Sequence, residues 1–255
     1  MKYCTRRSPR RRRMTAETGF LATSADLEAV RTPRTPAVVL ASPANPSGSV
    51  YTADQLTDIA EWALAHDVWV VYDQFVYGAN PDAGAAPHLL RLAPELRDRC
   101  LVVSGVSKAY AMTGRRIGWL AGPPAVVAAA RKHVARTITH VPTITQPALT
   151  GDQQPVHEAL ARYRRNRDVL ATALDGISGV RCPAPAGGMF VFPDVSVLLE
   201  RGSWATTLTL ATWLLEDAGV AVVPGEAFDA PGHVRLCFAV SPRPPTPPPR
   251  GWWST

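Results

Sequence analysis

The chain has few cysteines and no long apolar run, and each scarcity excludes a class of protein. Its four cysteines are scattered, with no Cys-x-x-Cys pair and no neighbouring histidine cluster. That pattern argues against a zinc site and against a disulfide framework, so we expect no bound metal and a reducing, cytoplasmic compartment. No apolar run reaches the roughly 18 residues that a membrane helix needs, and the basic N-terminus lacks the apolar stretch of a signal peptide. We therefore expect no membrane partner.

Acidic residues are outnumbered, but the excess of positive charge is confined to one end of the chain. The net charge is +6, and seven of the 27 Lys and Arg residues lie within residues 1–13. The remaining 20 face 21 Asp and Glu residues, so the rest of the chain is close to neutral. A basic arm can bind phosphate backbones by charge alone, but a disordered chain end is the simpler interpretation. We expect residues 1–14 to form a basic disordered arm and do not expect a nucleic-acid partner.

Proline crowds the other end of the chain. Residues 242–255 read PRPPTPPPRGWWST, a composition that can form neither a helix nor a central strand. We expect a proline-rich tail over 242–255 and ordered structure between this tail and the basic arm.

Short apolar runs in the first half predict buried strands. Ala37–Ala41, Val68–Tyr72 and Leu101–Val103 are continuous apolar runs of about five residues or fewer. Such runs are too short for buried helices and are typical of parallel strands that are covered on both faces. A helix is predicted between the first two runs, because Thr52 and Gln55 form a capping box before apolar residues at helical spacing. This β-α-β pattern predicts an α/β fold.

The second half changes character and predicts a separate small domain. A long Arg-rich helix is expected from about residue 155 to 176, and a second helix from about 204 to 218 stops at Gly219. Strands are expected at Met189–Phe192, Val220–Val223 and Val234–Val240.

Polar residues follow each apolar run of the first half, at the strand ends where ligands bind in open α/β sheets. The turn Asn45–Gly48 follows the first run, Asp73 follows the second, and Ser107 and Lys108 come after the third. Taken singly, each feature is ambiguous, because such turns, strand-end aspartates and Ser-Lys pairs also occur without function.

The combined set resembles the signature of the class I and II aminotransferases, which are fold-type-I enzymes that depend on pyridoxal phosphate (PLP). That family combines an Asn-Pro-x-Gly turn, a strand-end Asp, and Ser-Lys before Gly-x-Arg-x-Gly, which here is Gly114–Gly118. The resemblance runs from about Glu17 to Ser241 and includes Arg235, which lies 127 residues after Lys108.

The resemblance implies a fold and a domain organisation. We expect the remaining part of the mostly parallel sheet of a fold-type-I large domain, together with a smaller α+β C-terminal domain. The expected boundaries are a partial PLP-binding large domain over residues 15–150 and a small domain over residues 151–241.

The resemblance also implies a role for each site residue. PLP is an electron sink that must be held covalently, protonated on its ring nitrogen and anchored by its phosphate. Lys108 would form the aldimine with the cofactor aldehyde and would move the substrate α-proton. Asp73 would hold the proton of the ring nitrogen, and Arg116 would pair with the phosphate through its planar charged fork. The other implied contacts are Ser107 to the phosphate, Asn45 to the ring hydroxyl and Arg235 to the substrate carboxylate.

The sequence departs from the family pattern at a few positions. The Tyr that usually lies three residues after the Asp is Val76 here, and Tyr77 sits one residue later. On a continuing strand Tyr77 would point to the opposite face, so it would bind the cofactor hydroxyl only if the backbone bulges. Gly105 replaces a common phosphate-binding Ser, and Arg115 replaces a usual aromatic residue.

The matched region begins near the start of the chain, so we expect an N-terminally truncated member of the family. The implied reaction is amino transfer between an amino acid and a 2-oxo acid, in a family whose full-length members are homodimers. The same residues also serve PLP-dependent lyases, decarboxylases and oxidases, and a catalytically inert fragment is a further alternative. The substrate amino acid is not specified, because side-chain selectivity in the family depends on segments that precede the matched region.

Overall fold

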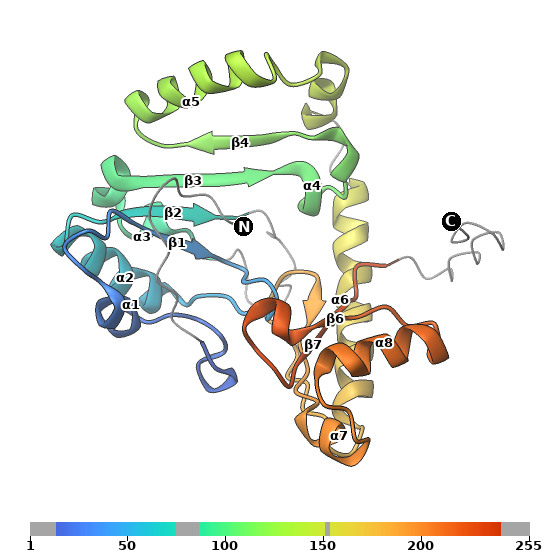
Figure 1. The fold of residues 1–255 in the computed structure, drawn as a ribbon. Coiled ribbons are helices and arrows are strands. Elements are labelled where there is room, and N and C mark those ends of the chain that lie inside the picture. Colours follow the sequence, from blue (N-terminus) through green and yellow to red (C-terminus); the bar gives the residue numbers. More distant parts are fainter. Residues whose placement is uncertain (1–13, 75–86, 151–153, 241–255) are drawn as a thin grey trace.

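The computed structural model describes residues 14–74, 87–150 and 154–240 (Figure 1). The proline-rich tail, Tyr77 and all of the expected arm except Met14 lie outside these ranges. The first half contains α1 (Ser24–Val30), β1 (Ala37–Ala41), α2 (Ala53–Ala65), β2 (Trp69–Asp73), α3 (Leu89–Leu92), β3 (Cys100–Gly105), α4 (Val106–Ala109), β4 (Gly118–Ala121) and α5 (Pro124–Thr137). The second half contains α6 (Gln154–Asp175), β5 (Phe190–Val191), α7 (Ser196–Arg201), α8 (Thr207–Ala218), β6 (Val223–Pro224) and β7 (Val234–Cys237). Short 3-10 helices lie at η1 (Ala16–Thr18), η2 (Pro94–Arg99), η3 (Thr113–Arg115), η4 (Thr143–Thr150) and η5 (Gly225–Phe228).

A four-stranded sheet forms the centre of the first half. Its order is β1-β2-β3-β4, in which the first three strands run parallel and β4 is antiparallel to β3. The predicted strand at 37–41 is confirmed as β1, the one at 68–72 is β2 shifted by one residue, and the one at 101–103 lies within β3. β4 was not among the strands predicted from the sequence.

Helices α2 and α3 cover one face of this sheet. The predicted capping box is confirmed at the start of α2, where Thr52 accepts a hydrogen bond from the Gln55 amide at 3.2 Å and Gln55 accepts one from the Thr52 amide at 2.9 Å. Side chains of α2 such as Leu56 are fully buried in one cluster with Val70 and Tyr72 of β2. The apolar stripe of α2 therefore packs against the alternate residues of the strands that point toward it.

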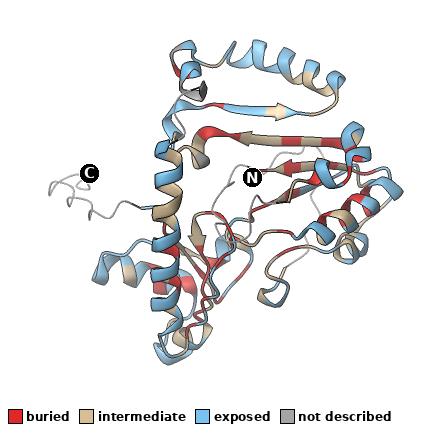
Figure 2. Ribbon diagram, turned by 180° about the vertical axis from the view of Figure 1, so that it is seen from behind, coloured by how far each residue is buried: buried red, intermediate tan, exposed pale blue. Residues whose placement is uncertain are grey.

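The described residues cover the opposite face of the sheet only in part. Val39, in the middle of β1, is 71% exposed. The strand register places Val71, Leu101, Val103 and Leu120 on the same face, and each of these is only partly buried. The sequence predicts strands that are covered on both faces of the sheet. Within the described residues, only the face under α2 and α3 is fully covered (Figure 2).

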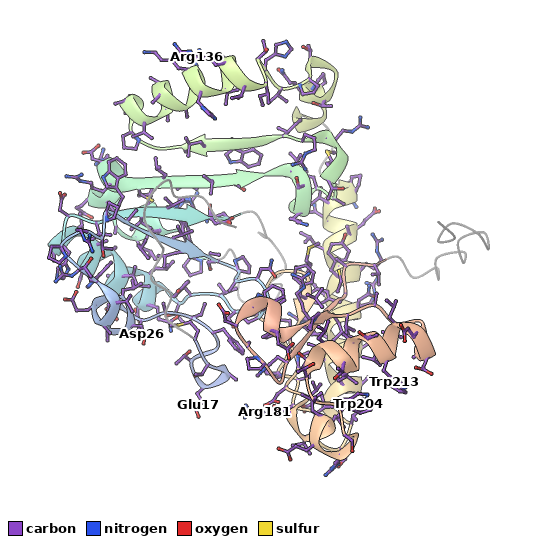
Figure 3. The ribbon with its side chains drawn as sticks, viewed as in Figure 1. Glu17, Asp26, Arg136, Arg181, Trp204 and Trp213 are labelled. Carbon is purple, nitrogen blue, oxygen red and sulfur yellow. The ribbon has the colours of Figure 1, made fainter. Side chains whose placement is uncertain are left out.

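The second half forms its own hydrophobic cluster around a three-stranded antiparallel sheet of order β5-β7-β6. The predicted long helix is α6. Its N-terminal end lies near β4, and the helix extends from there to the smaller sheet (Figure 1). Helix α8 ends at Gly219 as predicted, and this glycine has the left-handed φ of 66° that favours its residue type. The predicted strand at 220–223 is reduced to the two residues of β6. Trp204 packs against Trp213 of α8, with ring centroids 5.3 Å apart (Figure 3).

Two glycines allow the halves to meet closely. Gly48 has a φ of 70°, and a Cβ atom there would lie 2.5 Å from the carbonyl oxygen of Gly187 and from Cβ of Pro185. The amide of Gly187 donates to the carbonyl of Gly48 at 2.8 Å. The turn that follows β1 therefore contacts the glycine turn that precedes β5 through backbone atoms.

No helix within the described residues combines the length and the apolar content that spanning a membrane requires.

Candidate active site

The carboxyl ends of three neighbouring strands bring the predicted site residues to one edge of the large sheet. Ala41 of β1 is paired with Asp73 of β2, and Asp73 is paired with Val103 of β3. Beyond these pairs, the amide of Ser42 donates to the carbonyl of Asp73 at 3.1 Å, and the amide of Gln74 donates to that of Val103 at 2.9 Å. The turn with Asn45, the carboxylate of Asp73 and the segment with Lys108 all emerge at this edge.

The Asn45–Gly48 turn is closed by its own backbone. The amide of Gly48 donates to the carbonyl of Ala44, and the amide of Ala44 donates to the carbonyl of Ser49, both at 2.8 Å. The Ser42–Pro43 and Asn45–Pro46 peptide bonds are cis. This turn holds the exposed side chain of Asn45 at the strand edge.

Ser107 and Lys108 lie on α4, which begins directly after β3. Both side chains are half-buried. The ammonium of Lys108 makes no hydrogen bond or ion pair with residues in the described ranges, although the end of β2 lies beside the end of β3, the strand that leads into α4.

Arg116 lies eight residues after Lys108 and has a left-handed backbone, with φ 53°. Its Nη1 donates to the carbonyl of Thr113 at 3.0 Å, and the residue is otherwise exposed. Arg115 is also exposed. Asp73 is half-buried at the end of β2, and Tyr77 lies outside the described residues.

Arg235 of β7 reaches this edge from the second half of the chain. Its Nη1 donates to Oδ1 of Asn45 at 2.9 Å, across 190 residues of sequence. The guanidinium carbon lies 4.2 Å from the ring centroid of Phe190 and 4.9 Å from that of Phe228. Burial lowers the pKa of Arg235 from its usual value, yet a guanidinium stays charged at neutral pH.

Phe228 belongs to an aromatic cluster that continues away from Arg235. The ring of Phe192 lies edge-on to Phe228 at 5.8 Å and to Phe20 at 5.3 Å, and it stacks on His233 at 5.0 Å. Sequence reasoning missed Phe228, whose only signal was an aromatic residue shortly after the Pro224–Gly225 turn. The cluster ties the start of the described chain to the strand that carries Arg235.

The structure thus joins two of the predicted residues by a hydrogen bond. The others are brought to the same edge of the sheet only by the strands next to them in the sequence. Asn45 and Arg235 are hydrogen-bonded. Within the described ranges, neither Lys108 nor Arg116 has a side-chain hydrogen bond to another residue of the set. In the same ranges no group of three or more His, Cys, Asp and Glu side chains is arranged to hold a metal ion.

The side chains gathered near this edge offer the groups that an anionic ligand needs. Lys108 offers an amine, Asp73 offers a carboxylate, and Arg116 and Arg235 each offer a charged fork with several donors. Two permanent cations at different places on the rim suit a ligand with two anionic groups.

Comparison with known proteins gives consistent matches. Residues 2–244 match the family described as aminotransferase class I and II. The chain is 40% identical over 235 residues to an aspartate aminotransferase of Streptomyces avermitilis, covering 88% of this chain and 57% of that protein. It is 34% identical over 232 residues to an asparagine–oxo-acid transaminase of Streptococcus mutans, covering 89% of this chain and 59% of that protein.

Solved structures match the fold over the same portion. A tetra mutant of Thermus thermophilus aspartate aminotransferase superposes with a TM-score of 0.80 at 36% identity, covering 89% of this chain and 62% of that one. An aromatic aminotransferase from Pyrococcus horikoshii gives a TM-score of 0.81 at 29% identity, covering 89% and 61%. The chain therefore spans about three fifths of the length of the proteins that it matches.

Proposed function

Because the chain belongs to the family of class I and II aminotransferases, we propose that it carries the reactive part of an enzyme that moves an amino group between an amino acid and a 2-oxo acid. The hydrogen bond between Arg235 and Asn45 supports this most strongly. It joins the residue proposed for the substrate carboxylate to a residue proposed for the cofactor. A substrate whose carboxylate is bound by Arg235 would therefore lie beside a cofactor bound by Asn45.

The residues at the strand edge suit PLP as the cofactor. Lys108 has an unpaired amine among the described residues, Asp73 lies at the end of the neighbouring strand, and Arg116 is exposed with most of its donors unused. When bound, PLP supplies an electron sink for the electrons released at the substrate α-carbon. Lys108 would hold it covalently, Asp73 would accept a hydrogen bond from its ring N–H, and Arg116 with Ser107 would bind its phosphate.

Arg235 determines how Asn45 presents its amide. Since arginine has no acceptor, Asn45 must turn Oδ1 toward Arg235, as observed, and its Nδ2 group is left as a donor. That donor would face the ring hydroxyl of the cofactor. Tyr77 would be a second partner of the same hydroxyl.

The side chain of Lys108 would also transfer the proton. Its Nζ would take the proton from the substrate α-carbon and hold it beside the cofactor. Arg235 would orient the α-hydrogen for this transfer by binding the substrate carboxylate through two parallel N–H donors.

The substrates and the oligomeric state are proposed from the family to which the chain belongs. The aspartate and asparagine specificities in the names of relatives favour aspartate as the first amino donor to test. We further propose a cytoplasmic homodimer for the whole enzyme. The two hydrophobic clusters would be the cores of a large domain over 15–150 and a small domain over 151–241.

The chain has three lysines, Lys2, Lys108 and Lys132, which makes the cofactor assignment easy to test. Purified chain is incubated with PLP, reduced with borohydride and mapped by peptide mass. The label is expected on Lys108. It should be absent from the Lys108→Arg variant and present in the Lys132→Arg variant. A label confined to Lys2 or Lys132 would contradict the site.

The reaction itself is tested with aspartate and 2-oxoglutarate, once the part that this chain does not span is supplied. Glutamate formation at ordinary enzyme rates, roughly 1 per second or more, supports amino transfer. Release of a 2-oxo acid from the amino acid without any acceptor would instead assign a lyase or an oxidase.

A further inference from the structure

The 3-10 helix η5 carries the ring that lies over Arg235, so whatever fixes η5 also fixes that contact. The ring centroid of Phe228 lies 4.9 Å from the guanidinium carbon of Arg235. A 3-10 helix of four residues makes too few internal hydrogen bonds to hold its own geometry. The position of Phe228 therefore depends on the contacts that η5 makes with other elements.

Glu226 of η5 is bound to the first residue of α8. Its Oε1 accepts a hydrogen bond from the amide of Thr207 at 2.9 Å, and its Oε2 accepts one from the Thr207 hydroxyl. The first amides of a helix have no partner within the helix, and the helix dipole favours an anion beside them. Desolvation raises the pKa of Glu226, but the hydrogen bonds, chiefly those from Thr207, bring that pKa below its usual value. Glu226 is thus a carboxylate at neutral pH, and both of its oxygens tie η5 to α8.

Thr207 also binds the other end of η5. Its side chain is fully buried, and its hydroxyl accepts a hydrogen bond from the amide of Gly225 at 3.1 Å. The same amide donates to the carbonyl of His233 at 2.7 Å, and His233 lies two residues before Arg235. A threonine hydroxyl has one donor and two acceptor positions, so it can bond to Glu226 and Gly225 at the same time. Thr207 thereby joins α8, η5 and the strand that carries Arg235.

The guanidinium of Arg235 is held by three side chains, and Glu226 is not one of them. Asn45 accepts from its Nη1 at 2.9 Å, and the rings of Phe190 and Phe228 have centroids 4.2 Å and 4.9 Å from its central carbon. Within the described residues, the hydrogen bonds of the Glu226 side chain go to α8, and it forms neither a hydrogen bond nor an ion pair with Arg235. Phe228 is the neighbour that lies on η5. Without that ring the fork would be freer to rotate, and a carboxylate would bind a less preorganised partner.

We propose that Glu226 is a positioning residue for the substrate carboxylate: by holding η5 against α8, it keeps the ring of Phe228 over Arg235 and so fixes the direction of the guanidinium. This inference rests on the proposed function, in which Arg235 binds the substrate carboxylate. It adds that the affinity for that carboxylate depends on a glutamate whose hydrogen bonds go to a helix and not to Arg235.

The test uses the full 255-residue chain and two readouts that need no turnover. The first is the rate at which phenylglyoxal modifies Arg235, followed by peptide mass, with the exposed Arg181 of the same chain as reference. The second is the dissociation constant of succinate, a dicarboxylate without an amine, measured by titration calorimetry. Phenylglyoxal reacts with guanidinium groups, so its rate reports how well Arg235 is covered, whereas succinate reports how well the fork receives a carboxylate.

Glu226→Ala removes both hydrogen bonds to Thr207. Arg235 should then react severalfold faster relative to Arg181, and succinate should bind about threefold to tenfold more weakly, the loss expected for one cation–π contact. Glu226→Gln keeps an oxygen for the Thr207 amide and should restore both readouts to near the original values. Glu216→Ala, at an exposed position on α8, is the matched control and should change neither readout.

A double variant separates positioning from a general loss of stability. If Glu226 acts through the ring, Glu226→Ala adds no further loss of succinate affinity to Phe228→Leu. Thr207→Val removes the hydroxyl at nearly the same volume and should shift both readouts in the same direction, which keeps the test decisive if Glu226→Ala does not fold. Additive losses in the double variant, or equal readouts for Glu226→Ala and Glu216→Ala, would overturn the proposal.

The unmutated chain distinguishes a failure of this proposal from a failure of the proposed function. If succinate does not protect Arg235 even when the part that the chain does not span is supplied, Arg235 is not a carboxylate clamp and the proposed function is contradicted. Faster modification of Arg235 in Glu226→Ala would then still support its positioning by Glu226. If succinate protects Arg235 but Glu226→Ala behaves like the original chain, the carboxylate clamp is supported and the role of Glu226 is rejected.

Discussion

Arg235 and Asn45 are hydrogen-bonded at 2.9 Å although 190 residues separate them in the sequence. The bond crosses from the strand β7 of the smaller sheet to the turn after β1 of the larger one. It fixes the orientation of the Asn45 amide and one edge of the Arg235 guanidinium. The two halves of the chain therefore meet at these two side chains, and the proposed site can be tested from either half.

Arg235→Lys is expected to reduce kcat/KM for the amino acid in the assembled enzyme by roughly 30- to 150-fold, about 2–3 kcal/mol. Lysine keeps the charge but loses the planar fork that binds a carboxylate through two hydrogen bonds. PLP binding, followed by absorbance, should change little. Arg181→Lys, at an exposed position in the second half of the chain, is the control. Unchanged amino-acid kinetics would remove Arg235 from the role of carboxylate clamp.

Phe228→Leu is expected to raise the KM for the amino acid about threefold to tenfold while the rate at saturation changes little. The ring lies 4.9 Å from the guanidinium carbon of Arg235, and a cation–π contact of this kind contributes on the order of 0.5–1 kcal/mol or more when it is desolvated. Leucine fills similar space without an aromatic face. Phe228→Tyr keeps the face and should behave like the original protein. If Phe228→Tyr and Phe228→Leu lose substrate affinity equally, the ring acts through packing alone.

Gly48→Ala is expected to destabilise the chain by about 1–3 kcal/mol. Its φ of 70° is unfavourable for alanine, and the added Cβ would lie 2.5 Å from the carbonyl oxygen of Gly187. Gly114→Ala is the matched control, since a Cβ there meets nothing within 4 Å. Urea unfolding of both variants gives the comparison. Similar midpoints for the two would mean that the turn and the Gly187 backbone separate at little cost.

Glu28→Gln is expected to lower stability at neutral pH and to have little effect below about pH 2. The hydrogen bonds from Arg31, and next that from Trp62, lower the pKa of Glu28 from 4.5 to about 2. A carboxyl whose pKa is lowered by folding stabilises the protein above its unfolded pKa and loses that contribution as the pH falls through the folded value. The difference in thermal midpoint between Glu28→Gln and the original chain should therefore be full above about pH 4.5 and vanish toward pH 2. Glu61→Gln, on the exposed side of α2, is the control for removing one surface carboxylate. A difference that is constant across this range would contradict the prediction.

Local sequence signals predicted several of the elements, and the resemblance to the family supplied the roles of the candidate residues. The capping box of Thr52 and Gln55 starts α2, Gly219 ends α8, and short apolar runs mark β1, β2 and β3, because each of these features depends on neighbours within a few residues. Spacing along the chain also placed Asn45, Asp73 and Lys108 at strand ends, and parallel strands put those ends at one edge of the sheet.

Relationships between distant segments were decided by folding. No sequence pattern indicates that Arg235 donates to Asn45 or that Phe228 lies over Arg235, since both contacts depend on how two separate sheets are placed relative to each other. The exposure of Val39 is of the same kind. An apolar run predicts that a strand has two faces to bury, but whether both are covered depends on which helices the rest of the polypeptide brings to them.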